Sequence, residues 1–213
     1  MLHLYDSNIP SGNGYKVHLL LSHLRLPYHT TDLDLLTTPA ETRLPAYLAL
    51  NPNGRIPLII LDDATHTVLP ESSAILYYLA KDTPYLPSTH LGVTQVLRWM
   101  FFEQFSHEQY VAGLRFATHW IGLENVSAET RERLQTRGQA ALDTMEAHLE
   151  GKTFFVEEMY TIADIALFAY TQFAELVGFA VGGNVKAWLQ RVREQEGYVT
   201  IKDDPSGKAP SMK

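Results

Sequence analysis

Apolar positions in the first part of the chain switch between two spacings. Residues 2–5 form a short apolar run that predicts a strand, and a second strand is expected over residues 28–35. Between these strands, apolar residues recur at helical spacing at Val17, Leu20, Leu21 and Leu24. Since residues three and four apart share one face of a helix, this spacing predicts an amphipathic helix. An irregular helix is expected over residues 39–50.

The pattern continues with a turn signal and two further strands. Residues 51–57 (NPNGRIP) combine Pro, Asn and Gly, and the apolar run 58–61 is typical of a buried strand. Residues 68–69 predict an edge strand, and residues 72–81 predict a helix. The inward positions of that helix are predicted to be Ile75, Tyr78 and Leu79. The expected order is β-α-β-α-β-β-α, with helix-linked strands in parallel and the last two strands in an antiparallel hairpin.

The second half of the chain carries helical signals only. Residues 82–92 contain two prolines and few apolar residues, which predicts a linker. A long aromatic-rich helix is expected after it, then one capped by Ser127 and one capped by Asn184. The last of these helices has its inward positions at Val185, Trp188, Leu189 and Val192. We therefore predict an α/β domain over residues 1–81 and an all-α domain over residues 92–203.

Composition narrows the classes of function. The 213 residues carry a formal net charge of −7 and no basic run, which argues against nucleic acid as a partner. The absence of cysteine excludes disulfides, cysteine-ligated zinc and Cys-x-x-Cys chemistry, and it fits a reducing compartment. The nine histidines show no metal-ligand spacing, so no metal site is predicted. No apolar run approaches the ~20 residues of a membrane span, and the first residues do not resemble a secretory signal, so a cytoplasmic protein is expected.

Three segments together resemble the glutathione S-transferase superfamily. They are NPNGRIP at residues 51–57, LPESSAILYYLA at residues 69–80, and TIADIALFAY at residues 161–170. Each is weak alone, but their order and spacing are specific, and the resemblance extends from the first strand to the last long helix. It implies a cysteine-free relative of the bacterial cytosolic enzymes, with a thioredoxin-like N-terminal domain and an all-helical C-terminal domain.

The resemblance assigns the first two segments to a glutathione site. A cis peptide bond before Pro57 would turn the backbone of Ile56 toward the tripeptide, which could then pair with it as an added strand. Glu71 would offset the ammonium of the γ-glutamyl group, and Ser72, at a helix start, would hold its carboxylate. Without the resemblance, an ordinary trans proline and a plain helix cap would be the better interpretations.

The glycyl carboxylate of glutathione needs a cation or an amide donor. Arg43, Arg55 and Lys16 are the available cations, and the sequence does not rank them. Taken one at a time, each is more often a solvated surface charge than a ligand.

The loop after the first strand holds the candidates for contact with the glutathione sulfur. The resemblance implies a hydroxyl donor there, because such a donor favours thiolate over thiol, and Ser11 is the first candidate. Asn13 is a second candidate donor, and Tyr5, at the end of the first strand, competes for the same role. A polar glycine-containing loop with no catalytic role is the alternative. Without cysteine, a mixed disulfide between protein and glutathione is excluded.

In the helical domain, the resemblance implies a pocket for a second, apolar substrate. The residues expected to line it are Phe102, His107, Tyr110 and Arg115. Core packing is the alternative interpretation for each. Thr161 and Asp164 form a predicted capping box, with Asp164 buried and structural.

The function predicted from these features is conjugation of the glutathione thiolate to electrophilic, largely apolar small molecules. Glutathione is then a co-substrate, no prosthetic group is needed, and a homodimer is expected. A glutathione-dependent disulfide-bond reductase or peroxidase is the alternative within enzymes. A non-catalytic glutathione-binding or regulatory protein is the alternative of another class, and retention of Glu71 and Ser72 argues against it.

Overall fold

The computed structural model describes residues 1–201. Among these residues, the chain forms two compact units. The first contains residues 1–80 together with residues 197–201, and the second contains residues 81–196. The last two residues of the predicted helical domain, 202 and 203, lie outside the described part of the chain.

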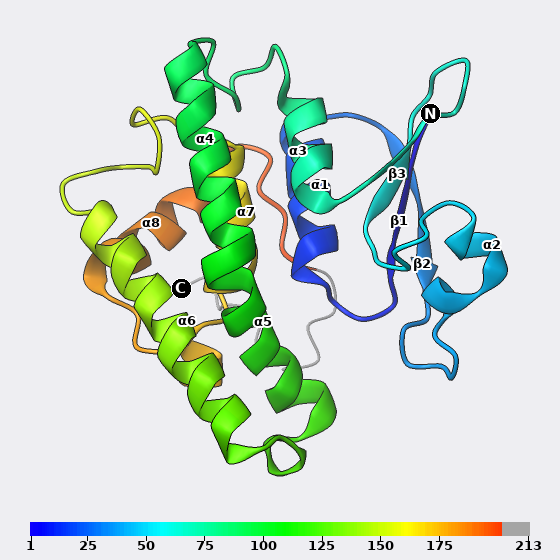
Figure 1. The fold of residues 1–213 in the computed structure, drawn as a ribbon. Helices are drawn as coiled ribbons and strands as arrows, with labels where there is room; N and C mark the ends of the chain where they lie inside the picture. The colour runs from blue at the N-terminus through cyan, green and yellow to red at the C-terminus, as the bar shows by residue number, and fades with distance from the viewer. Residues whose placement is uncertain (202–213) are drawn as a thin grey trace. The chain divides into compact units, whose positions relative to one another are not determined.

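The first unit is a four-stranded mixed sheet with helices (Figure 1). The sheet order is β2-β1-β3-β4. Its elements are β1 (Leu2–Ser7), α1 (Gly12–His23), β2 (Tyr28–Leu33), the 3-10 helix η1 (Glu41–Arg43), α2 (Pro45–Leu48), β3 (Leu58–Ile60), β4 (Val68–Pro70) and α3 (Ser72–Ala80). The predicted α/β class and element order are confirmed.

The prediction that all helix-linked strands run parallel is wrong for β3. β1 and β2 are parallel, as expected for strands joined by a helix, and β3 and β4 form the predicted antiparallel pair. However, β3 also runs antiparallel to β1, with Leu4 opposite Ile59. The connection from β2 to β3 contains only short helical turns and returns the chain in the opposite direction, so it is not a parallel crossover.

The core of this unit lies between the sheet and helices α1 and α3. Leu4 and Ile59 from the sheet pack with Val17, Leu21 and Ile75 from the helices. The prediction that Tyr78 points inward is wrong, because this side chain is 53% exposed and Leu76 is buried instead. Positions 72, 75, 76 and 80 share the buried face of α3, and Tyr78 lies away from that face.

The second unit is helical throughout, as predicted. Its elements are α4 (His90–Phe102), the π-helical segment η2 (Glu103–Glu108), α5 (Gln109–Phe116), the π-helical segment η3 (Ala117–Ile121), the 3-10 helix η4 (Leu123–Asn125), α6 (Ala128–His148), α7 (Ile162–Thr171), the 3-10 helix η5 (Glu175–Val177) and α8 (Gly183–Arg193). Every residue of α7 is buried, so α7 is the central helix of this unit.

Two of the three helix caps predicted in this unit are confirmed. Ser127 caps α6, and Thr161 and Asp164 form the capping box of α7. Asn184 is not a cap, because α8 begins one residue earlier and has Gly182 at its N-cap position. The carboxylate of Glu146 on α6 accepts from the backbone N–H of Asn184 at 3.0 Å, so a distant side chain replaces the local cap.

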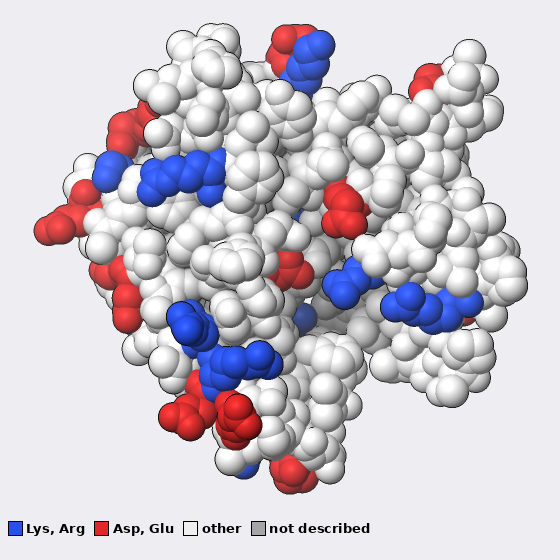
Figure 2. All heavy atoms as spheres, in the orientation of Figure 1, with Lys and Arg blue, Asp and Glu red and all other residues white. Residues whose placement is uncertain are grey.

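Charged groups are dispersed over the molecular surface in view. On the face drawn in Figure 2, acidic and basic side chains are interspersed among uncharged ones. Exposed ion pairs such as Lys186–Glu175, at 2.7 Å, contribute little to stability. None of the helices in residues 1–201 is long and apolar enough to span a membrane.

Candidate functional site

The N-terminus of α1 is built around Ser11. This residue is the N-cap of the helix, and its Oγ accepts from the backbone N–H of Gly14 at 3.4 Å. Since the hydroxyl oxygen is the acceptor in that contact, the hydroxyl hydrogen remains able to donate elsewhere. Ser11 also lines a cavity of about 460 Å³ in the first unit.

Asn13 connects the start of α1 to the start of α3. Its Oδ1 accepts from Ser72 Oγ at 3.2 Å and from Lys16 Nζ at 2.7 Å. Lys16 is completely buried, and Ser72 is 5% exposed. The structure therefore brings together two predicted site residues that lie 59 positions apart in the chain.

Glu71 occupies an unusual backbone conformation directly before α3. Its φ is +74°, in the left-handed region that L-residues rarely adopt. Its carbonyl accepts from the N–H of Ile75 at 2.9 Å, and its exposed carboxylate accepts from Asn53 Nδ2 at 3.4 Å. Backbone strain of this kind is concentrated at ligand sites in proteins, which makes Glu71 a candidate binding residue.

The segment before β3 has the predicted cis bond between Ile56 and Pro57. The preceding carbonyl, that of Arg55, accepts from Tyr47 Oη at 2.7 Å and from Asn51 Nδ2 at 2.8 Å. Ile56 is half-buried, and its backbone makes no hydrogen bond to another described residue.

The two candidate arginines are both exposed. Arg43 Nη1 donates to the carbonyl of Asn53 at 3.2 Å, so its guanidinium lies over the turn that precedes Arg55. Asn53 thus contacts both Arg43 and Glu71, so two of the predicted site residues lie at this turn.

Tyr5 lies apart from Ser11. On β1, Leu4 and Asp6 are buried on the side of α1, and Tyr5 alternates to the opposite face of the sheet. Its ring contacts that of Tyr47 on α2, with centroids 5.9 Å apart. The structure therefore does not bring the two rival candidates for the sulfur contact together.

The four residues predicted to line a second-substrate pocket have different environments. His107 is fully buried and forms a 3.0 Å hydrogen bond between its Nε2 and Thr171 Oγ1 on α7. Arg115 is 3% exposed and lies over the ring of Phe173, 4.4 Å from its centroid. Phe102 and Tyr110 are half-buried.

Sequence reasoning missed a polar group in the first unit. Asp6, His18 and Tyr28 are joined by hydrogen bonds and line the same cavity as Ser11. The predicted strand ends at residue 5, one residue before Asp6, whereas β1 continues to Ser7. Leu4 and Asp6 share one face of β1, so a charge at an inward-facing position is the signal that a longer predicted strand would give.

Comparison with known families covers most of the chain. Residues 10–82 match the description "Glutathione S-transferase, N-terminal domain", and residues 93–196 match "Glutathione S-transferase, C-terminal domain". Among curated proteins, glutathione S-transferase 1 of Schizosaccharomyces pombe is 32% identical over 179 residues, which are 80% of this chain and 74% of that protein.

Solved structures of similar proteins point to the same family. A glutathione S-transferase from Pseudomonas fluorescens is 42% identical, with a TM-score of 0.86 over 95% of this chain and 99% of that one. A glutathione transferase from Burkholderia graminis is 29% identical, with a TM-score of 0.79 over 92% of this chain and 85% of that one. The Burkholderia structure contains two glutathione molecules per subunit.

Proposed function

The chain belongs to the glutathione S-transferase family, and on that premise we propose that it binds glutathione and conjugates it to electrophilic, largely apolar small molecules. The observation that carries the proposal is the Asn13–Ser72 hydrogen bond of 3.2 Å, which joins the loop expected to hold the sulfur to the helix start expected to hold the γ-glutamyl group. The glutathione bound to the Burkholderia relative supports the same ligand here.

The proposed pose uses three parts of the first unit. The γ-glutamyl carboxylate binds at the start of α3, at Ser72, where the N-terminal N–H groups and the helix dipole favour an anion. The γ-glutamyl ammonium pairs with Glu71. The peptide backbone pairs with the N–H and C=O of Ile56, which make no hydrogen bond to other described residues. Arg43 and Arg55 are the cations proposed for the glycyl carboxylate.

Ser11 is the proposed donor to the sulfur. Its oxygen accepts from Gly14, so its hydroxyl hydrogen can donate to the thiolate. Such a hydrogen bond stabilises the thiolate more than the thiol, which lowers the thiol pKa. Asn13 is the second candidate for this contact. Tyr5 is the weakest of the three, because its ring packs on the opposite face of the sheet against Tyr47.

For the second substrate, Phe102 and Tyr110 are the proposed contact residues, because both are half-buried. His107 and Arg115 are fully or nearly fully buried, so their proposed role is to position the helices that carry the contact residues. The reaction then depends on orienting the electrophile against the thiolate.

We also propose a cytoplasmic homodimer. Leu91, Phe101 and Phe105 are 67%, 68% and 77% exposed in the single chain, and apolar groups this exposed are typical of a contact surface. Two-fold pairing is the commonest way to cover such a surface. Sedimentation at micromolar concentration should give the mass of two chains, and a single-chain mass would contradict the proposal.

The test of the sulfur contact is the thiolate absorbance of bound glutathione against pH. Ser11→Ala should raise the pKa of the bound thiol by about one unit, equivalent to ~1.36 kcal/mol, and slow turnover near neutral pH. Glutathione affinity should change little, and the defect should shrink well above the thiol pKa. Tyr5→Phe should have much less effect. A shift of the thiol pKa seen only in Tyr5→Phe would assign the sulfur contact to Tyr5. If neither variant shifted the thiol pKa, Asn13 or backbone amides would be the donors to the sulfur.

Assays with glutathione and a panel of substrates distinguish the activities. Turnover of electrophiles supports conjugation, whereas turnover of only mixed disulfides or peroxides would support a reductase or peroxidase. Binding of glutathione by calorimetry without any turnover would identify a non-catalytic binding protein.

A further inference from the structure

A polar cavity of about 460 Å³ lies within the first unit, between β1, α1 and β2. Its volume falls within the range of small-molecule sites, roughly 300–1,000 Å³. The polar side chains that line it are Asp6, Ser7, Asn8, Ser11, Tyr15, His18, Ser22, Tyr28, Thr30, Asp32 and Thr200. Two of these are carboxylates, and none of the lining residues is lysine or arginine, so the cavity favours a cation.

Strand β2 contributes one complete face to this cavity. Tyr28, Thr30 and Asp32 line it, whereas His29 and Thr31 do not. This alternation is the period of a strand, in which every second side chain lies on the same face. Asp32 is exposed, so it lies at the opening of the cavity. Asp6 is 7% exposed and lies at the floor of the cavity.

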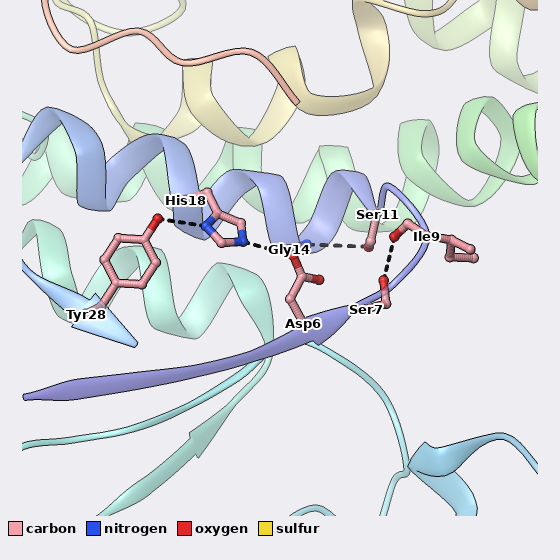
Figure 3. Close-up of polar contacts among 7 residues, drawn as sticks. All are labelled: Asp6, Ser7, Ile9, Ser11, Gly14, His18 and Tyr28. Carbon is pink, nitrogen blue, oxygen red and sulfur yellow. Dashed lines mark hydrogen bonds and ion pairs between the residues drawn. The ribbon is translucent and has the colours of Figure 1, made fainter. Parts of the chain in front are cut away.

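The floor is organised by a chain of hydrogen bonds (Figure 3). Tyr28 Oη lies 2.8 Å from His18 Nδ1, and His18 Nε2 lies 3.0 Å from Asp6 Oδ2. Both ring nitrogens of His18 are therefore engaged. Burial, and then the charge of Asp6, raise the pKa of the Tyr28 phenol, so it stays protonated and can donate to His18. This chain fixes the orientation of the Asp6 carboxylate.

The second carboxylate oxygen of Asp6 has no partner. Oδ1 is buried and forms no hydrogen bond. In Figure 3 one oxygen of Asp6 is turned toward His18 and the other toward the side of Ser7 and Ser11, two residues that line the cavity. An unpaired buried carboxylate oxygen is costly, and a positive charge in the cavity beside this carboxylate would offset part of that cost.

The far wall is the segment that follows the helical unit. Tyr15 Oη donates to the carbonyl of Val199 and Ser22 Oγ donates to the carbonyl of Gly197, both at 2.7 Å. The segment approaches α1 closely at Gly197, which has a φ of +84° and lies where a Cβ would be 3.1 Å from the Cα of His23. Val199 and Ile201, with Ile9 and Pro10, give the cavity an apolar side.

These features favour an organic cation over a metal ion as the ligand of the cavity. No group of three or more His, Asp or Glu side chains within residues 1–201 is placed to hold a metal. A protonated primary amine needs one carboxylate, hydroxyl and carbonyl acceptors, and an apolar surface for its body. We propose that this cavity is a binding site for a small organic amine, whose ammonium group pairs with the Asp6 carboxylate and whose apolar part lies against Ile9, Pro10 and Val199.

The test uses benzylamine, which is cationic at neutral pH, and benzyl alcohol, its neutral counterpart. Calorimetric titration of the full chain, without glutathione, should show binding of benzylamine and at least tenfold weaker binding of benzyl alcohol. Asp6→Asn keeps the shape of the side chain and should weaken benzylamine binding about tenfold or more, because a charge-assisted hydrogen bond is lost. Since glutathione is absent, failure of the proposed glutathione site would not affect the result.

A second variant tests the location without changing Asp6. Thr30→Trp places a large ring in the cavity from an exposed strand position and should abolish binding, whereas His29→Trp, on the other face of β2, should not. Equal binding of the amine and the alcohol, or unchanged binding in Asp6→Asn or in Thr30→Trp, would overturn the proposal. Lys202 follows Ile201 and lies outside the described residues, so Lys202→Ala is titrated as well. Amine binding that appeared only in Lys202→Ala would also overturn the proposal.

Discussion

The two units each bury an aspartate, and the two carboxylates have opposite surroundings. Asp164 in the helical unit accepts from Thr161 N at 2.9 Å, from Phe155 N at 3.2 Å and from Trp188 Nε1 at 2.9 Å. Asp6 in the sheet unit has His18 on one oxygen and no partner on the other. Both residues are less than one-tenth exposed.

The two surroundings predict different consequences of mutation. All the hydrogen-bonding capacity of Asp164 is directed inward, to α7, α8 and the segment before them, so its loss should affect folding. In the sheet unit, by contrast, Asp6 and Ser11 have hydrogen-bonding capacity that no other described residue uses, and Glu71 has a strained backbone. Such features cost stability unless a ligand uses them, so changes there should affect binding more than folding.

The largest expected effect is that of Asp164→Ala. It leaves the N–H groups of Thr161, Phe155 and Trp188 buried without their acceptor, and each such group costs about 1–3 kcal/mol. We expect the free energy of unfolding, measured with urea, to fall by about 3–5 kcal/mol. Asp143→Ala on the exposed face of α6 is the control and should stay within about 0.5 kcal/mol of the unchanged protein. A loss no larger than the control would contradict the structural role.

The next effect is a pH dependence carried by the same carboxyl. Burial raises the pKa of Asp164 from 3.8 to about 6, although the donors around it act in the opposite direction. The folded state therefore binds more protons than the unfolded state between these values, and stability contributed by Asp164 is lost as the pH rises through about 6. Relative to Asp164→Asn, the free energy of unfolding should fall by about 3 kcal/mol between pH 3.8 and 6. Parallel pH profiles for the two proteins would contradict this expectation.

An effect of similar size, but on glutathione binding instead of stability, is expected from the double change Glu71→Ala with Ser72→Ala. Both proposed contacts to the γ-glutamyl group are lost, and each charge-assisted hydrogen bond is worth about 1.5–3 kcal/mol. Glutathione affinity, measured by calorimetry, should fall about 100-fold or more with little change in Tm. Asp82→Ala with Thr83→Ala is a matched control, because Asp82 is also an acidic residue with a φ of +61° followed by a hydroxyl. An unchanged affinity in the first variant would place the site elsewhere.

The sequence predicts local features of this molecule well and distant ones poorly. The caps at Ser127 and Thr161 follow from residues three apart, so they are visible in the sequence. The start of α8 was mispredicted because its cap comes from Glu146, 38 residues earlier. The Asn13–Ser72 contact and the chain from Tyr28 to Asp6 likewise join separate elements, and only the folded structure brings them together.

The smallest expected effect tests whether the backbone at Glu71 is kept strained for binding. A non-glycine residue in the left-handed region costs roughly 1–2 kcal/mol, whereas glycine adopts it freely but loses more entropy on folding. Glu71→Gly should therefore raise the free energy of unfolding by about 0.5–1 kcal/mol. It should also weaken glutathione binding about tenfold, because the carboxylate is lost.

Asp82→Gly relieves the same kind of backbone strain outside the proposed site, so it should give a similar gain in stability with unchanged glutathione affinity. If Glu71→Gly bound glutathione normally, the strain at residue 71 would have no connection with the ligand. Only Asp6 and Ser11 would then support the proposed difference between the internally hydrogen-bonded aspartate of the helical unit and a ligand site in the sheet unit.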